Sequence, residues 1–327
     1  MIKKQDIALL ILALFVAGGC EKVSLPAEAE KQVEIGFAVA NSVVQPMTRT
    51  VATRGAETPT ATEKTINNLY IFLFPQDGGV IKQYIETSTA SNSEYALITG
   101  AETGVKLLTV TQSQAGTSDV YIVANCSDIK SSLDGVSSAA DLNNVLHTIT
   151  MPGEIVANNL LMVGKSSTAY NFITDHQLKT IPLTRAMARI DVELTLGSEY
   201  QSSTPSEYGY RCIDFGSELW LVEKADPQET EKVVSTVSSP VVVWNEVTTY
   251  PATGTISKIS FSVYLNEYNN TGDTTAPIAS IEIKLPLNDT GGPLPPPEFG
   301  GDLYRFYLPA EVKRNRVYQY TLEAGYN

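Results

Sequence analysis

The body of the chain is a succession of short apolar or alternating runs separated by turn residues. The clearest is 69–74, an unbroken apolar run followed by Pro75 and the pair Gly78-Gly79. Such a run, ended by turn residues, predicts a strand that is buried on both faces. Further strands are expected at 106–112, 119–125, 160–164, 178–183, 188–196, 218–223, 240–244, 256–265, 278–285, 303–308 and 317–323.

One short helix is predicted among these strands. Its apolar residues follow the helical spacing i, i+3, i+4 and i+7: Leu142, Val145, Leu146 and Ile149. Ser138 stands where a cap is expected, and Pro152-Gly153 would stop the helix. Many short strands with one helix indicate a mainly β protein built from β-sandwich domains. A boundary near residue 183 divides the body into 55–183 and 184–327.

A separate strand is predicted ahead of this body. Val33, Ile35, Phe37 and Val39 alternate with smaller or polar residues, which predicts a strand with one apolar face. The following stretch, 41–62, is polar and contains two prolines and two arginines, Arg49 and Arg54. We expect it to be an exposed linker of the kind that proteases cut.

The N-terminus has the pattern of an export signal. Two lysines precede the apolar run 7–16, which is too short to span a bilayer as a helix. The run leads to Ala17-Gly18-Gly19-Cys20, which resembles the bacterial lipoprotein signal, in which the cysteine receives lipid and becomes the new N-terminus. We therefore expect a signal peptide at 1–19 and lipid on Cys20; the alternative is an ordinary secretory signal with a chance cysteine.

Charge excludes one large class of function. The chain has 23 Lys and Arg against 36 Asp and Glu, a formal net charge of −13, and no Lys/Arg cluster. A protein without a surplus of cations lacks what phosphate backbones require, so no nucleic-acid partner is expected.

Neither the cysteines nor any known catalytic motif in the sequence indicates an enzymatic activity. Beside Cys20, the chain has Cys126 and Cys212, which would form one disulfide or, as we favour, remain two separate buried thiols. The sequence contains no phosphate-cradling glycine loop, no His-Glu-x-x-His, no Gly-x-Ser-x-Gly and no Cys-x-x-Cys.

The remaining titratable residues are better read as solvated groups. His147 lies off the apolar stripe of the helix, and His176 lies in a turn beside Asp175. Asp191 and Glu193 share one strand face, where a solvated face is favoured over a carboxylate pair or a calcium site. We expect no catalytic residue, no metal and no cofactor.

Several stretches, taken in order, resemble the fimbrial subunits (fimbrillins) of the Bacteroidales, the type V pilins. They are Cys20, the arginine-bearing linker, 63–74 (EKTINNLYIFLF), 119–125 (DVYIVAN), 183–192 (LTRAMARIDV), and 306–309 (FYLP) followed by Arg314-Asn315 and Val317-Tyr318. Most of these stretches are predicted strands. Their order and spacing over nearly the whole chain carry the resemblance.

The resemblance implies two transthyretin-like β-sandwich domains and an assembly route. Lipid on Cys20 delivers the precursor to the outer membrane, and an Arg-specific protease cuts the linker. The strand that carries Val33, Ile35, Phe37 and Val39 then leaves, and a donor strand from a neighbouring fimbrial subunit fills the groove. Arg54 is the expected cut and Arg49 the second choice; the alternative is two solvated linker charges. The product would be a fimbrium on the cell surface, with a host or bacterial adhesion ligand as a further partner.

The position within the fimbrium follows from the family pattern of donor strands. Stalk subunits carry an extension beyond the last core strand, whereas this chain stops at Gly325-Tyr-Asn327, directly after the strand expected at 317–323. The expectation is a tip subunit, with a stalk subunit as the second choice.

Two rival classes of function stay open at this stage. The first is an outer-membrane surface lipoprotein that keeps its lipid and binds a glycan or another small ligand. The second is an enzyme, such as a glycosidase with paired carboxylates. The N-terminus of the protein on cells distinguishes the lipoprotein from a fimbrial subunit. A start near Gly55 would indicate a fimbrial subunit, and a lipid-modified Cys20 would indicate the lipoprotein.

Overall fold

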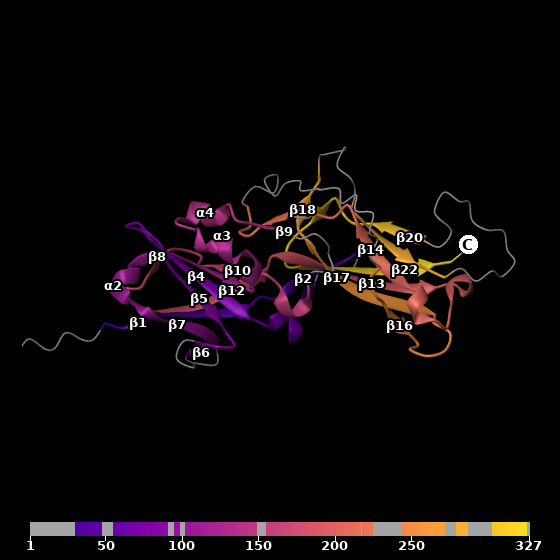
Figure 1. Ribbon diagram of the computed structural model, residues 1–327, viewed down its shortest axis with the longest axis horizontal. Coiled ribbons are helices and arrows are strands. Elements are labelled where there is room, and N and C mark those ends of the chain that lie inside the picture. Colours follow the sequence, from indigo (N-terminus) through magenta and orange to yellow (C-terminus); the bar gives the residue numbers. More distant parts are fainter. Residues whose placement is uncertain are drawn as a thin grey trace, which may run out of the picture. The chain divides into compact units, whose positions relative to one another are not determined.

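Strands dominate the computed structural model, as the sequence pattern predicts (Figure 1). The structure describes residues 30–47, 55–90, 95–98, 102–148, 155–216, 218–224, 244–271, 279–286 and 303–325. Residues 32–327 form one unit, separate from 1–31, and the following description concerns that unit. The fold class, mainly β with sandwiched sheets, is confirmed.

The first large sheet has nine strands, in the order β5-β4-β8-β10-β12-β1-β7-β6, with β11 paired to β8. Its strands are β1 (Gln32–Val39), β4 (Asn68–Pro75), β5 (Ile81–Glu86), β6 (Tyr95–Ile98), β7 (Glu102–Thr111), β8 (Thr117–Ala124), β10 (Met162–Lys165), β11 (Tyr170–Asn171) and β12 (Gln177–Arg185).

The second large sheet has six strands, in the order β16-β17-β13-β22-β2-β3. They are β2 (Ser42–Pro46), β3 (Gly55–Glu57), β13 (Met187–Leu196), β16 (Thr248–Tyr250), β17 (Lys258–Asn266) and β22 (Arg316–Ala324). A three-stranded sheet packs with it, in the order β14 (Gly209–Ile213), β19 (Ser280–Lys284) and β20 (Leu303–Tyr307). Two small pairs complete the described strands: β9 (Leu146–Thr148) with β15 (Glu218–Trp220), and β18 (Tyr268–Asn269) with β21 (Glu311–Val312).

Strand β4 shows why its sequence is apolar without alternation. Leu69, Ile71 and Leu73 point into one hydrophobic core, which they share with β1, β7 and β12. Tyr70 and Phe72 point into a second core on the other face. Both faces of the strand are therefore buried, and no position is left for a polar side chain.

The predicted helix is shorter than the pattern suggests. Helix α4 (Ala139–Asn143) begins at Ser138, whose hydroxyl accepts a hydrogen bond from Asp141 N, as expected of a cap. It ends at Asn143, and Leu146 and His147 belong to β9 instead. The expected continuation of the helix is wrong for 146–148, because pairing with β15 draws these residues into a strand; Ile149 lies outside the described residues.

Short helical turns fill several connections between the strands. They are α2 (Gln112–Ala115), α3 (Lys130–Asp134), η1 (Thr62–Lys64), η2 (Ser127–Ile129), η4 (Ala157–Asn159), η5 (Ser198–Tyr200) and η6 (Pro205–Glu207). Helices α3 and α4 contribute Leu133 and Leu142 to the core on the outer face of β4.

The stretch predicted as an exposed linker is partly strand. Within 41–62, β2 pairs with β22 and β3 pairs with β2, so the segment after β1 enters the second large sheet. The expectation of a wholly exposed linker is wrong for these two strands. The predicted domain boundary at 183 lies inside β12, and the strand expected at 240–244 lies outside the described residues apart from Trp244.

Candidate functional site

The segment 32–46 is inserted into both large sheets (Figure 1). Its first strand, β1, lies between β12 and β7, parallel to β12 and antiparallel to β7. Phe37 stands opposite Ile181 on one side, and Ile35 stands opposite Val105 on the other. We call the space between β12 and β7 the β1 slot.

The apolar face of β1 is buried as the alternation predicts. Val33 and Ile35 are 0% exposed and Phe37 is 1% exposed. Val39 is half-buried at the end of the strand and packs against the same core. Of the intervening residues, Ala38 is exposed. Three of the four predicted side chains are thus fully removed from water.

The second strand, β2, lies between β22 and β3, parallel to β22 and antiparallel to β3. Val44 stands opposite Val317, and Met47 N donates to Gln319 O at 2.8 Å. Val43 is 40% exposed, so its side chain contributes little burial, and backbone pairing holds this part of β2. We call the space between β22 and β3 the β2 slot.

Residues 40–42, which we call the crossover, carry the chain from one slot to the other. Ala40 N donates to Leu183 O at 2.8 Å, and Val43 N donates to Asn315 O at 3.1 Å. The Asn315 side chain donates from Nδ2 to Asn41 O at 2.9 Å. Asn315 has φ of 53°, a conformation that asparagine tolerates better than most residues.

Arg185 reaches the crossover from the end of β12. Its Nη2 donates to Ala40 O at 3.2 Å and to Ser42 Oγ, and its Nε donates to Asn315 Oδ1 at 3.2 Å. The residue is only 3% exposed, and burial lowers the pKa of the guanidinium from its ordinary value. Its Nη1 has no hydrogen-bond partner, and Arg185 forms no ion pair, among the described residues.

A second arginine, Arg189, binds three carboxylates, one of which is Glu57 at the end of β3. Its guanidinium lies 2.6 Å from Glu57, 2.9 Å from Glu63 and 2.9 Å from Asp191. Glu63 is 2% exposed and also accepts from Tyr264 OH at 3.1 Å. Burial alone would raise the pKa of Glu63, but the hydrogen bond from Thr60 N and the charge of Arg189 outweigh it and lower that pKa. We call this group the Arg189 cluster.

The other predicted site residues fall into two groups. Cys20, Arg49 and Arg54 lie outside the described residues. Cys126 and Cys212 are both free thiols, and burial raises the pKa of the Cys126 thiol to about 12. Sequence reasoning missed Arg185 and Asn315 as parts of the site, although both lie in stretches that carry the family resemblance.

His176 and Glu193, which the sequence analysis assigns to solvated groups, each lie beside a charged neighbour. His176 Nδ1 lies 3.7 Å from Asp175 Oδ1, whose partner at 3.0 Å is Gln177 N. Glu193 pairs with Lys258 at 2.8 Å. No group of three or more His, Cys, Asp or Glu in this part of the chain could hold a metal ion.

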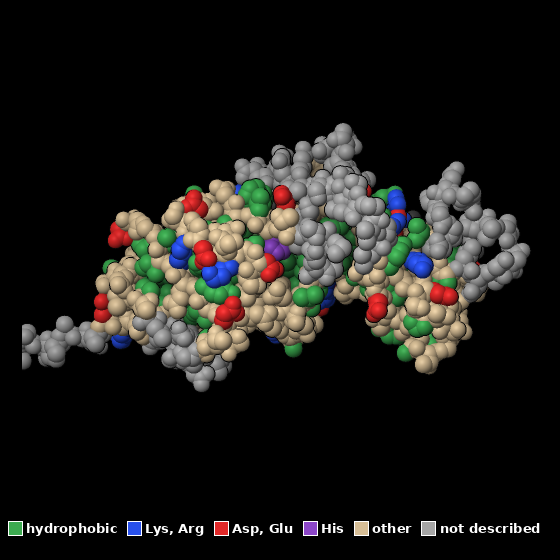
Figure 2. Space-filling model, in the orientation of Figure 1, with side chains coloured by type: hydrophobic (Ala, Val, Ile, Leu, Met, Phe, Trp, Pro, Cys, Tyr) green, Lys and Arg blue, Asp and Glu red, His purple; other side chains and the backbone are tan. Residues whose placement is uncertain are grey.

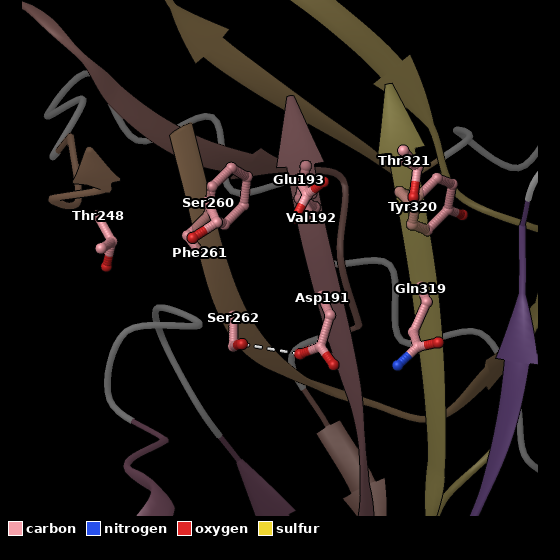
Figure 3. A pocket seen from close by; sticks show the side chains of 10 residues that line it. All are labelled: Asp191, Val192, Glu193, Thr248, Ser260, Phe261, Ser262, Gln319, Tyr320 and Thr321. Carbon is pink, nitrogen blue, oxygen red and sulfur yellow. Dashed lines mark hydrogen bonds between the residues drawn. The ribbon is translucent and has the colours of Figure 1, made fainter. Parts of the chain in front are cut away.

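An open concavity of about 380 Å³ lies over β13, β17 and β22 (Figure 3). Polar side chains dominate its lining, and the Ser262 hydroxyl donates to Asp191 at 2.7 Å across it. On the face seen in Figure 2, Lys and Arg side chains lie among Asp and Glu and form no continuous basic surface over the described residues. In the same residues no helix is long and apolar enough to cross a membrane.

Comparisons with known proteins give the family. Residues 186–323 match the family described as the C-terminal part of the minor fimbrium tip subunit MfA4, and residues 35–180 match that of the major fimbrial subunit protein FimA. The chain is 32% identical over 293 residues to the minor fimbrium tip subunit MfA4 of Porphyromonas gingivalis, with 80% of this chain and 83% of that protein covered. The chain belongs to the Bacteroidales fimbrial subunit family.

A solved structure supports the fold of this fimbrial subunit. A candidate cell adhesion protein from Parabacteroides distasonis superposes with a TM-score of 0.51 at 16% identity, over 89% of this chain and 88% of that one. Membership of the family makes the protein a structural, non-enzymatic component of a fimbrium on the cell surface. The rival reading as an enzyme is thereby set aside.

Proposed function

We propose that the protein is made as a lipidated precursor and enters the fimbrium by strand exchange. In this scheme Cys20 carries the lipid at the outer membrane, and an Arg-specific protease cuts after Arg54, or after Arg49. The segment 20–54 then leaves, and a strand of a neighbouring subunit takes the place of β1 and β2. The observation that carries the proposal is the burial of β1 inside a sheet, on a segment joined to the body through the stretch that holds both arginines.

The departure of β1 would leave the first sheet in an aggregation-prone state. Strands β12 and β7 are joined through β1, so its loss exposes unpaired backbone groups on both flanking strands. Val33, Ile35 and Phe37 contribute about 5–9 kcal/mol by burial, at about 1.5–3 kcal/mol each. A vacated slot of this kind is a strong template for a strand from another chain.

The second slot adds a requirement on the replacing strand. Because β2 leaves with β1, β22 and β3 also lose their shared neighbour. A replacing segment that fills both slots as 32–46 does would span the same length and run parallel to β12 and then to β22. This is a longer and more specific joint than one strand in one groove.

For the position in the fimbrium we propose the tip. The support is the 32% identity to a protein named as a minor fimbrium tip subunit. The strand β22 also pairs with β13 from Val317 to Ala324, a pairing that the release of β2 does not touch, and Val317 and Tyr318 are each 1% exposed. Withdrawing β22 to donate it elsewhere would forfeit several kcal/mol of burial, at about 1.5–3 kcal/mol per large side chain.

The N-terminus of the protein isolated from fimbriae tests the processing step. Mass spectrometry should find a start at Gly55, or at Thr50 if Arg49 is the cut, and lipid on Cys20 in the uncut precursor. The double variant Arg49→Ala with Arg54→Ala should stay lipidated and unassembled, while the two single variants identify the site. Fimbriae whose subunit keeps 32–46 and its lipid would refute the proposed processing. A lipidated, uncut form on the cell surface with none in the fimbriae would favour the rival, a surface lipoprotein that binds a glycan or another small ligand.

A further inference from the structure

The guanidinium of Arg185 is a buried charge whose partners are largely on the segment that the proposed cut releases. Two of its three acceptors, Ala40 O and Ser42 Oγ, belong to the crossover. The third, Asn315 Oδ1, belongs to the body, and Asn315 itself donates to Asn41 O in the crossover. Loss of the segment would therefore leave Arg185 with one acceptor.

The nearby carboxylates do not replace these partners. Burial lowers the pKa of Arg185, and the charges of Glu63 and Glu57 offset this only in part, because both carboxylates are bound to Arg189. A guanidinium carries five N–H donors and cannot be deprotonated near neutral pH. A buried charge without hydrogen-bonded partners is strongly unfavourable. Once residues 40–42 have left, the Arg185 guanidinium therefore requires new hydrogen-bond acceptors from the replacing strand.

We infer that Arg185 selects the replacing strand by a side-chain acceptor at the position of Ser42, with a carboxylate preferred over a hydroxyl. The inference rests on the proposed strand exchange and names the chemistry of its partner. Ser42 Oγ offers one oxygen to Nη2, and Nη1 beside it has no partner among the described residues. The carboxylate of an aspartate or glutamate has two oxygens, which can accept from Nη1 and Nη2 of Arg185 together, and a negative charge that compensates the guanidinium.

The experiment uses the chain from Cys20 onward, with Cys20→Ser and a recognition sequence for a specific protease in place of 48–54. After cutting, the native segment is removed by size-exclusion chromatography and the protein is mixed with fluorescent synthetic peptides of residues 30–47. Fluorescence anisotropy then gives their affinity for the vacated slots. The peptides are the native one, Ser42→Ala, Ser42→Asp and Ser42→Asn. The asparagine peptide matches aspartate in size and lacks its charge.

On the wild-type body, Ser42→Ala should bind about tenfold to a hundredfold more weakly than the native peptide, the range for a hydrogen bond to a charged group. Ser42→Asp should bind at least tenfold more tightly than Ser42→Asn. In the Arg185→Gln body these preferences should vanish. The control is Arg316→Gln: Arg316 Nη1 donates to Gln45 Oε1 of β2 at 3.1 Å, three residues beyond Ser42, so its loss should keep the ranking.

Equal affinity of all four peptides for the wild-type body would overturn the role of Arg185 and leave strand exchange intact. Failure of the native peptide to enter the cut protein at any concentration would refute strand exchange itself, and this inference with it. The peptide series on the wild-type body decides the matter even where Arg185→Gln does not fold.

Discussion

The binding of β1 in the first large sheet can be weakened by substituting one residue. Phe37 is 1% exposed and is the largest apolar side chain of β1. Replacing a buried phenylalanine by alanine costs about 3–5 kcal/mol, through lost transfer energy and the cavity left behind. That is about half of the 5–9 kcal/mol assigned to the apolar face of β1.

The expected result is faster loss of the segment after cutting. In uncut protein the tether keeps β1 at a high effective concentration beside its slot, so Phe37→Ala should remain assembled. Once the linker is cut at an inserted protease site, the full destabilisation acts on a bimolecular equilibrium. The affinity of segment for body should then fall by about two to three and a half powers of ten, at 1.4 kcal/mol for each power.

Size-exclusion chromatography of the cut protein, followed over time, measures the fraction of segment still bound. The matched control is Ala38→Ser, one residue along the same strand, where the side chain is exposed and the change should be within about 0.5 kcal/mol. Equal retention of the two variants would refute the argument that burial of the apolar face holds β1 in place.

Four further outcomes follow from the structure. Gly164→Ala should lower the free energy of unfolding by about 1–3 kcal/mol in a denaturant titration, because the added methyl carbon would lie 2.8 Å from Pro182 O. The Glu63 pKa is lowered in the folded state, so its stabilising contribution is complete above its ordinary value of 4.5 and is lost as pH falls below it; Glu63→Gln should flatten that part of the acid-unfolding curve. Cys126, with its pKa raised to about 12, should resist iodoacetamide at pH 8 until urea is added, as peptide mass spectrometry would show. Immunogold labelling should mark one end of each fimbrium, and labelling along the shaft would refute the tip position.

The strands that could be predicted from the sequence are those in which the pattern of apolar and polar residues follows the burial of each face. Val33, Ile35 and Phe37 alternate because β1 has one buried face, and 69–74 is wholly apolar because β4 has two. Strand β2 was not predicted because its residues do not alternate between buried and exposed positions. Val43 is exposed, and the pairing with β22 uses backbone groups that every residue possesses.

Two other features were hidden for a different physical reason, which is distance along the chain. Leu146 fits a helical spacing, but its actual partner is Trp220 in β15. The hydrogen bond from Arg185 to Ala40 joins residues 145 positions apart. A local pattern cannot report a partner of that kind, so the burial of Arg185 and its place at the crossover required the folded chain.

The two slots also determine how a joint between subunits would carry load. Backbone hydrogen bonds to β1 run to β12 on one side and to β7 on the other, across the direction of the strand. A pull on the ends of any strand held there acts along the strand and therefore shears all of these bonds together, instead of opening them one after another. The β2 slot repeats the arrangement between β22 and β3. A tip attached in this way would resist drag best when tension runs along the inserted strand.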